Sequence, residues 1–502
     1  MKALAHLSEP LLRFAYGQAM EDPRDGLTLF GPLESGKPYG LRAGVIGTPD
    51  GIAKFSRWVE WIQGPIRAYG YERGRPPFPG FESAFRMPWA AVPLLTITVD
   101  PEELSQRVVL ENAHERVYQT VELYADPLRR TRTDEEVKPD VWFVVVPDIV
   151  RKYCRPKAIV EPELRRMGSR MFSSTKEAQS FLSSPSLFAE QNVAARPYSY
   201  KEHFRNQLKA RLLGSYIATQ VVRESTLENI GPQGSSRAEQ GMERLQSGIA
   251  WNLCTTAFYK CGGRPWRVEG IRDGVCYVGI VFKKDNSADE RMACCGAQMF
   301  LDSGDGVVFK GAVGPWYNTV EREFHLSREA ACDLARMAIA SYETKHGGPP
   351  REIFFHGQTL FNGNEMRGFA EATPATTDLT GVKITDDASL KLFRRADTPV
   401  LRGTAYLRGA RNGYLWTRGW IPRMQTYPGM EVPNPLRIEI CSGTTELRTV
   451  MQDILALTKL NYNACVFGDG RPITIKFANA VGEVLTAGPA PSEAPLPFMY
   501  YI

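Results

Sequence analysis

Four polar side chains are spaced so that they could bind an anion together. Arg205 and Lys209 are four residues apart in a predicted helix over 200–213, so both lie on one face of it. Gln220 follows eleven residues after Lys209, and Lys260 stands directly before a Cys-Gly-Gly sequence. Charged donors form short, strong hydrogen bonds to phosphate. A basic pair on a helix is more usually part of a solvated surface, so the spacing alone does not establish a binding site.

The cysteines and histidines do not form a metal-binding pattern. The chain has nine cysteines and six histidines, without a CxxC pair and without a Cys/His cluster at zinc spacing. His356 follows a predicted buried strand, but a metal site needs several ligands, so a packed or hydrogen-bonded histidine is the simpler interpretation. Reduced, mostly buried thiols are typical of cytosolic proteins. We therefore predict a cytoplasmic protein without a zinc site.

Length and composition indicate a globular protein of two or three domains. The chain has 502 residues, of which 43% are apolar and 23% are charged. The net charge of +5 is mild, so any phosphate-binding residues must be concentrated at one place. The sequence contains no apolar run of about 18 residues and no signal peptide, and we predict no membrane span.

Buried strands and amphipathic helices alternate in the first half of the chain. The sequence DVWFVVVPD at 140–148 is a nearly continuous apolar run, as in a parallel strand that is buried on both faces. A ligand of such a sheet is expected beyond the carboxyl ends of its strands. The Ser-rich segment 168–198 is predicted to be a surface loop or lid. Other predicted strands are 41–47 and 92–99, and other predicted helices are 51–62 and 239–260.

After the sequence RPW at 264–266 the pattern changes. Three consecutive strands are followed by alternating helices and strands, which is the order of an RNase H-like fold. We place a domain boundary near 266–270. The predicted strands are 274–284, 294–302, 306–314 and 351–357, and the predicted helices are 327–345 with Ser327 as N-cap, 444–460 and 478–485.

Several segments resemble Argonaute proteins. AFYKCGGRPW (257–266) is similar to the end of the MID domain, and PREIFFHGQTLFNGNE (350–365) to a PIWI segment that begins with a buried strand. LTKLNYNACVFGDGRPITIKFANAVGEVL (457–485) is similar to the C-terminal PIWI segment. The length leaves no room for the N and PAZ domains, so the chain resembles a short prokaryotic Argonaute.

This resemblance implies an α/β fold with two domains. A Rossmann-like MID domain would be followed by an RNase H-like PIWI domain. The expected divisions are an N-terminal segment at 1–40, a MID-like domain at 41–268 and a PIWI-like domain at 269–502.

The resemblance also assigns the four polar residues. In this family, residues at the positions of Arg205, Lys209, Gln220 and Lys260 hold the 5′ phosphate of a guide. Some members have a second lysine where this chain has Thr256, and in relatives without it a bound divalent cation supplies the charge. The family's C-terminal carboxylate often joins the pocket. We therefore expect a structural Mg²⁺ beside the phosphate, with the carboxylate of Ile502 as a ligand.

The resemblance further implies that the chain does not cleave nucleic acid. PIWI cleavage needs carboxylates that hold two metal ions. Val281, Gly357 and Asn479 stand at three of the expected positions, and none of them carries a carboxylate. Other carboxylates that could rebuild a site are Asp302, Asp305, Asp386 and Glu365, although surface or turn positions are their more usual role.

The expected partners follow from the same resemblance. They are a guide RNA, a single-stranded DNA target from plasmid or phage, and an effector protein with an APAZ region. That effector would be a TIR or sirtuin-like NADase, less commonly a nuclease, which forms a heterodimer with this chain, oligomerises on activation and causes abortive infection. Residues that could contact the nucleic-acid backbone are Arg151, Lys152, Arg155, Lys283, Lys284 and Lys476.

Two other functions remain open from the sequence. The chain could be an active guided nuclease whose carboxylates lie at other positions, which predicts cleavage that depends on Mg²⁺ or Mn²⁺. It could also be a nucleic-acid-binding protein that acts without an effector.

Overall fold

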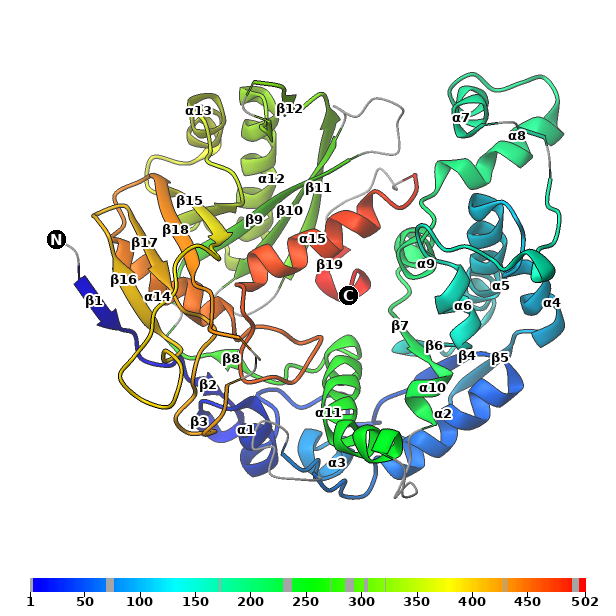
Figure 1. Cartoon of the computed structure of the whole chain (residues 1–502), viewed down its shortest axis with the longest axis horizontal. Helices are drawn as coiled ribbons and strands as arrows, with labels where there is room; N and C mark the ends of the chain where they lie inside the picture. Colours follow the sequence, from blue (N-terminus) through cyan, green and yellow to red (C-terminus); the bar gives the residue numbers. More distant parts are fainter. Residues whose placement is uncertain are drawn as a thin grey trace.

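The structure is a computed structural model that describes residues 3–502, apart from 69–75, 170, 173, 229–236, 271, 285–292, 302–305, 321, 428, 430 and 490–495. Two large sheets organise the chain. Figure 1 shows the smaller sheet with its helices on the right and the larger sheet on the left, with helices α11 and α15 between them. None of the described helices is long and apolar enough to span a bilayer.

The smaller sheet is four-stranded and fully parallel, in the order β5-β4-β6-β7. Its strands are β4 (Ala43–Gly47), β5 (Leu95–Thr98), β6 (Val141–Val146) and β7 (Thr219–Arg223). Helix α2 (Pro49–Trp61) packs against one face, and α5 (Ala113–Asp134) and α9 (Phe204–Leu212) pack against the other. Burial on both faces explains why β6 has no polar residue. This is the predicted Rossmann-like sheet.

The larger sheet is mixed and ten-stranded, in the order β1-β16-β17-β18-β15-β14-β9-β10-β11-β19. Its centre is an antiparallel meander of β9, β10 and β11, to which β14 and then β15 add in parallel. This is the predicted RNase H-like sheet. The strands are β1 (Ala3–His6), β9 (Val275–Lys284), β10 (Ala293–Leu301), β11 (Gly306–Gly314), β14 (Glu352–Gly357), β15 (Asp378–Asp386), β16 (Thr404–Leu407), β17 (Asn412–Leu415), β18 (Leu436–Ser442) and β19 (Leu496–Pro497).

Helices cover both faces of the larger sheet. Helices α12 (Arg328–His346) and α13 (Gly363–Ala372) pack against one face, and α14 (Leu447–Leu457) and α15 (Ile473–Leu485) against the other. The remaining elements of eight or more residues are α1 (Pro23–Phe30), α7 (Thr175–Ser183) and α11 (Arg237–Lys260). The shorter helices are α3 (Phe81–Phe85), α4 (Pro101–Arg107), α6 (Asp148–Tyr153), α8 (Ala189–Ala195) and α10 (Glu224–Leu227), and the small sheets contain β2 (Leu12–Arg13), β3 (Ala19–Met20), β8 (Arg267–Val268), β12 (Tyr317–Asn318) and β13 (Glu323–Phe324).

Most predicted elements are present, and two predictions were wrong. The segment 168–198 is not a loop, because it contains α7 and α8, and the Ser174 side chain caps α7 by accepting from the Glu177 N–H at 3.2 Å. Its serines are therefore helix-capping and helix-surface residues. The last helix begins at Ile473, five residues before the predicted start. The prediction that Ser327 caps α12 is confirmed, since its Oγ accepts from the Ala330 N–H at 3.2 Å.

The N-terminal segment is built into the larger sheet. Strand β1 pairs with β16, and β2 pairs with β8. Because β8 lies where the sequence predicts the domain boundary, a strand of the N-terminal segment is paired to the junction between the two halves. The predicted division at residue 268 remains a prediction.

Candidate functional site

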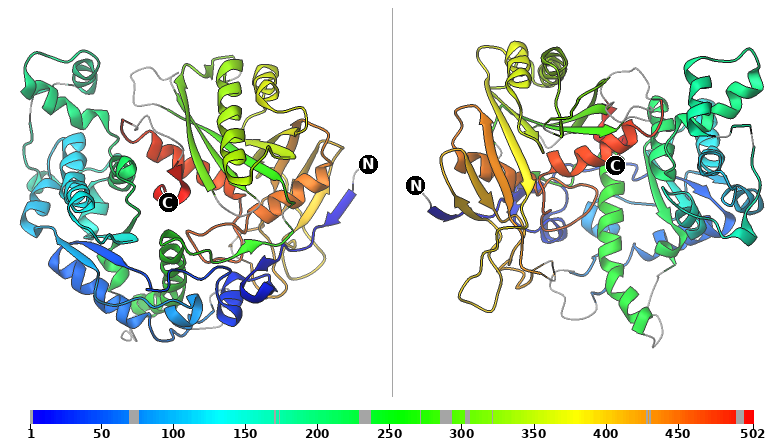
Figure 2. Two further views of the ribbon diagram at one scale, coloured as in Figure 1. Left: turned by 180° about the vertical axis from the view of Figure 1, so that it is seen from behind. Right: turned by 45° about the horizontal axis from the view of Figure 1, so that its top comes forward.

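Helix α9 is buried, although its sequence is basic. His203 caps it, with its Nδ1 accepting from the Asn206 N–H at 3.4 Å. The helix packs against α5 and α15, and Lys209 is only 2% exposed. Figure 2 shows α9 beside α15 in both views. A solvated basic surface is therefore the wrong interpretation for Lys209, and burial of its charge needs another explanation.

Two lysines from distant segments meet in one pocket. The Lys209 ammonium donates to the Thr219 carbonyl at 3.1 Å and also to the Ile502 carbonyl. Lys260, the last residue of α11, donates to the same two carbonyl oxygens at 2.9 and 2.7 Å, and to the Gln220 Oε1 at 2.7 Å. Lys260 is 1% exposed. The two ammonium groups thus share two backbone acceptors, which fixes their positions.

This pocket, formed by Lys209, Lys260, Thr219, Gln220 and Ile502, carries positive charge without a carboxylate side chain. Among the described residues, no Asp or Glu side chain pairs with either lysine. Burial holds the pKa of Lys209 well below its usual value, and repulsion from Lys260 and Arg205 lowers it further. Burial, followed by repulsion from Arg205, likewise lowers the pKa of Lys260. A bound anion would offset both effects, so the pocket is suited to one.

Arg205 lies at the rim of this pocket. Its guanidinium donates to the Tyr501 carbonyl and to the Asn206 Oδ1, each at 3.4 Å. Burial lowers its pKa, and the nearby Glu483 opposes that shift. The structure thus brings together all four predicted phosphate-binding residues and the end of the described chain. Sequence reasoning did not identify Thr219, which accepts through its carbonyl and, from Lys209 at 3.4 Å, through its hydroxyl. It also did not identify Glu483, whose charge opposes phosphate binding.

The pocket lies at the opposite end of the smaller sheet from the one where the sequence predicted a ligand. Thr219 is the first residue of β7, so the lysines gather at the amino end of that strand and not beyond the carboxyl ends. At the carboxyl end, the Glu224 carboxylate accepts from the Thr48 hydroxyl at 2.7 Å. Thr48 is the N-cap of α2, where an anion would otherwise be expected to bind. A carboxylate of the chain itself thus occupies that position.

The described side chains fit a phosphate better than Mg²⁺ in this pocket. Magnesium needs oxygen ligands. The oxygens that face the pocket are those of Thr219, Gln220 and Ile502, and each of them already accepts a hydrogen bond from a lysine ammonium. A dication there would also lie close to two positive charges.

The three positions expected to lack cleavage carboxylates lie near α15 and its sheet. Val281, on β9, is 6% exposed and faces α15, since its Cγ2 is 3.1 Å from where a Cβ at Gly482 would lie. Gly357 ends the neighbouring strand β14, and a Cβ there would approach the Phe361 ring at 2.8 Å, on the other face of the sheet. Asn479 is half-buried on α15.

No cluster of three or more His, Cys, Asp or Glu residues that could hold a metal occurs among the residues that the structure describes. His356 is 1% exposed, its Nδ1 is 2.9 Å from the Thr474 hydroxyl, and burial lowers its pKa to about 3, so it is a packed neutral histidine. Glu365 closes the capping box of α13 and contacts His325 at 2.9 Å. Asp386 pairs with Arg471. Asp302 and Asp305 lie outside the described residues.

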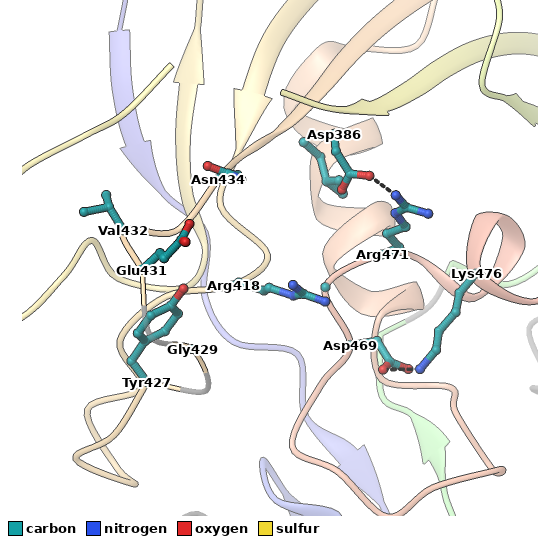
Figure 3. A pocket seen from close by; sticks show the side chains of 12 residues that line it. Asp386, Arg418, Tyr427, Gly429, Glu431, Val432, Asn434, Asp469, Arg471 and Lys476 are labelled. Atoms are coloured by element: carbon teal, nitrogen blue, oxygen red, sulfur yellow. Dashed lines mark hydrogen bonds and ion pairs between the residues drawn. The ribbon is translucent and has the colours of Figure 1, made fainter. Parts of the chain in front are cut away.

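A second, polar cavity of about 710 Å³ lies at the other end of α15 (Figure 3). Asp386 pairs with Arg471 across it, and Asp469 pairs with Lys476. Arg418 lies between these two pairs in Figure 3 and is exposed. Unlike the lysine pocket, this cavity therefore pairs most of its charges internally.

The predicted backbone-binding residues are dispersed. Arg151 and Lys152 are exposed on α6, with Lys152 paired to Glu161 at 2.7 Å, and Arg155 is exposed just after that helix. The remaining three lie along α15 and the end of β9. Lys283 faces Glu483 at 3.6 Å, the Lys284 carbonyl accepts from Lys201 at 3.0 Å, and Lys476 lines the cavity.

Solved Argonaute structures match this arrangement over the whole chain. Clostridium butyricum Argonaute, solved with a guide DNA and a 19-mer target DNA, aligns with a TM-score of 0.64 at 13% identity, over 100% of this chain and 55% of that one. The chain has an Argonaute fold. Aa-Ago with externally bound siRNA and Drosophila Piwi also match, each with a TM-score of 0.56 at 14% identity, over 99% of this chain and 56% of theirs.

The chain spans about half the length of these Argonautes. No protein-family model matches its sequence, and no curated protein does. The likeness therefore establishes the fold. We call the smaller sheet with its helices the MID-like domain and the larger sheet with its helices the PIWI-like domain.

Proposed function

We propose that this Argonaute-like chain binds the 5′ phosphate of a guide RNA in the lysine pocket and uses the guide to recognise complementary single-stranded DNA. The observation that carries this proposal is the pair of ammonium groups of Lys209 and Lys260, which are 2% and 1% exposed and have no Asp or Glu side chain as a partner among the described residues. Such a buried, positively charged pocket binds a phosphate dianion through charge-assisted hydrogen bonds. A 5′-hydroxyl end would leave the lysine charges uncompensated.

The rest of the guide is proposed to follow α15 from the pocket to the polar cavity. Asn206 of α9 contacts α15 near its C-terminal end, and Lys476 near its N-terminal end lines the cavity. A helix of 13 residues is about 20 Å long. At about 3.4 Å for each nucleotide along a helix axis, this length corresponds to about six nucleotides. Base pairing supplies the sequence specificity, and phosphate contacts supply affinity that falls with salt.

We further propose that the chain does not cleave its target. Val281, Gly357 and Asn479 offer no carboxylate where two metal ions would have to be held. The rival proposal is an active guided nuclease. Incubation of the loaded chain with complementary DNA and Mg²⁺ or Mn²⁺ separates the two, because cleavage products would identify the nuclease.

The output of recognition is proposed to come from a second protein in the cytoplasm. The resemblance to short prokaryotic Argonautes supports an effector with an APAZ region and a TIR or sirtuin-like NADase domain, which would deplete NAD⁺ and cause abortive infection. A chain that acts alone is the alternative. Copurification with the product of the adjacent gene, followed by an assay of NAD⁺ loss after target addition, distinguishes them.

The lysine pocket is tested by purifying the chain with that gene product and sequencing the bound nucleic acid. We expect short RNAs that carry a 5′ phosphate. The Lys209→Ala, Lys260→Ala double variant should lose them. A matched control is the Lys176→Ala, Lys345→Ala variant, which removes two exposed lysines on α7 and α12 and changes the net charge equally.

Random fragments without a 5′ phosphate, retained equally by both double variants, would show that the pocket does not bind guide ends. Thermal unfolding of each variant separates loss of binding from loss of folding. If the alanine double variant does not fold, a double variant with methionine at the same two positions is used instead, because methionine keeps most of the buried side-chain volume.

A further inference from the structure

A carboxylate faces the basic rim of the lysine pocket. Glu483, on α15 of the PIWI-like domain, accepts from the Asn206 Nδ2 at 3.3 Å and lies 3.6 Å from the Lys283 ammonium. It also opposes the lowering of the pKa of Arg205 and of His203, which burial causes in both. The single negative charge of Glu483 therefore acts on residues of α9, on the His203 that caps α9, and on Lys283 of β9.

The donors around Glu483 are fixed in place, whereas the Glu483 carboxylate itself can move. Asn206 is 6% exposed, and a Cβ at Gly482 would lie 2.7 Å from the Lys283 Cγ, so the lysine stem lies directly against α15. The Glu483 side chain, in contrast, is 54% exposed. Its ion pair with Lys283 is long and solvated, and such pairs stabilise a fold very little. The donors are held in place, while the carboxylate can turn into solvent.

We propose that Glu483 is an internal anion that competes with a backbone phosphate of the bound strand for Lys283 and Asn206. This inference rests on the proposed function. A terminal phosphate in the inner pocket contacts Lys209 and Lys260 and leaves Glu483 in place. A strand with further phosphates brings a second negative charge toward the rim, and the carboxylate must turn away before Lys283 and Asn206 can bind it.

The consequence is selection by length. A nucleoside monophosphate or inorganic phosphate gains nothing from displacing Glu483, whereas an oligonucleotide regains the lost contact through its own phosphate. Glu483 thus reduces the affinity for a strand, because two like charges at one site repel each other. A charge that opposes a ligand in this way favours ligands with enough other contacts to overcome it.

Glu483→Gln tests this role because it removes the charge and keeps the shape. Binding of a 5′-phosphorylated 18-nucleotide RNA and of a 5′ nucleoside monophosphate is measured for the chain with its copurified partner, at low salt. We expect the variant to bind the RNA about fivefold more tightly, with less than a twofold change for the mononucleotide, as for loss of one partly screened repulsion.

The matched control is Glu190→Gln, which changes the net charge equally at an exposed position on α8. Lys283→Ala provides a second test, because the gain from Glu483→Gln should disappear in the double variant if both act on the same phosphate. An equal gain in the control, an equal gain for the mononucleotide, or weaker RNA binding would each overturn the inference. Wild-type protein that does not prefer a 5′ phosphate would instead overturn the proposed function first.

Discussion

Buried lysines occur at two places in this chain, with opposite surroundings. Lys459 is buried just after α14, where it donates to the Glu9 carboxylate at 2.7 Å. Arg402 donates to both oxygens of the same carboxylate at 3.1 and 2.9 Å. Burial opposes ionisation of Glu9, but these two cations hold its pKa below its usual value. In the lysine pocket, Lys209 and Lys260 have carbonyl and amide oxygens instead.

The difference separates a structural cluster from a binding site. The cluster of Glu9, Arg402 and Lys459 provides its own anion, and it joins the N-terminal segment to the PIWI-like domain. Burial lowers the pKa of Lys459 to about 8, with Glu9 opposing the shift. The pKa values of the pocket lysines are lowered by burial and by neighbouring positive charge, and no Asp or Glu side chain among the described residues offsets this. A buried cation without an internal anion is thus the better indicator of function.

The largest effect is expected when the structural cluster is broken. Lys459→Met leaves the buried Glu9 with one cation and removes donors to the Phe467 and Glu21 carbonyls, so the free energy of unfolding should fall by about 3 kcal/mol. The midpoint of urea unfolding measures it. Adding Glu9→Gln should restore part of the loss. A Lys459→Met variant as stable as the wild type would show that the cluster of Glu9, Arg402 and Lys459 does not stabilise the fold.

The opposite result is expected in the lysine pocket. Lys260→Met removes a buried charge that has no carboxylate side chain as partner, so the melting temperature of the ligand-free chain should not decrease. The same change should remove about 1.5–3 kcal/mol of the preference for a 5′-phosphorylated strand over a 5′-hydroxyl strand, as for one hydrogen bond to a charged group. Competition binding with the two strands checks this, and an unchanged preference would contradict it.

The pH dependence should distinguish the pocket as well. Both pocket lysines have folded pKa values below the usual 10.5. Between those values and 10.5 the folded chain holds fewer protons than the unfolded chain, so its stability rises with pH. Bound phosphate favours the protonated lysines, so the preference for a 5′ phosphate should fall several-fold as pH rises through their folded pKa values. Binding measured at a series of pH values below 10.5 tests this, with Lys209→Met, Lys260→Met as the variant that should show neither trend.

The smallest effect is expected at the polar cavity, where charges are already paired. Lys476 pairs with Asp469, so Lys476→Ala should weaken binding of a long strand only about threefold and reduce the salt dependence by about one phosphate contact. Strands shorter than about six nucleotides, which do not reach the cavity, should not be affected. A titration of strand length at two salt concentrations tests this, and an equal loss for a dinucleotide would exclude the proposed path along α15.

The fold could be predicted largely because its signals are local. The continuous apolar run of β6 and the order of strands after residue 266 give both sheets, and Ser327 marks the start of α12. Helix α5 was not predicted, since most of its residues are polar and Pro127 lies within it. The helices at 168–198 were mistaken for a loop, because serine is common both in loops and at helix ends.

The sequence alone determined that Arg205 and Lys209 share one helix face, and it placed Lys260 at the end of a second helix. Only the tertiary structure decided that both lysines are buried and meet at the same oxygens. Lys209 and Lys260 reach Ile502 across 293 and 242 residues of sequence. Ile502 was expected in the pocket only from the resemblance, and because every residue carries a backbone carbonyl, no pattern could single out Thr219 as an acceptor. The opposing charge of Glu483 likewise arises only where α15 packs against α9, because long-range packing brings the two helices together.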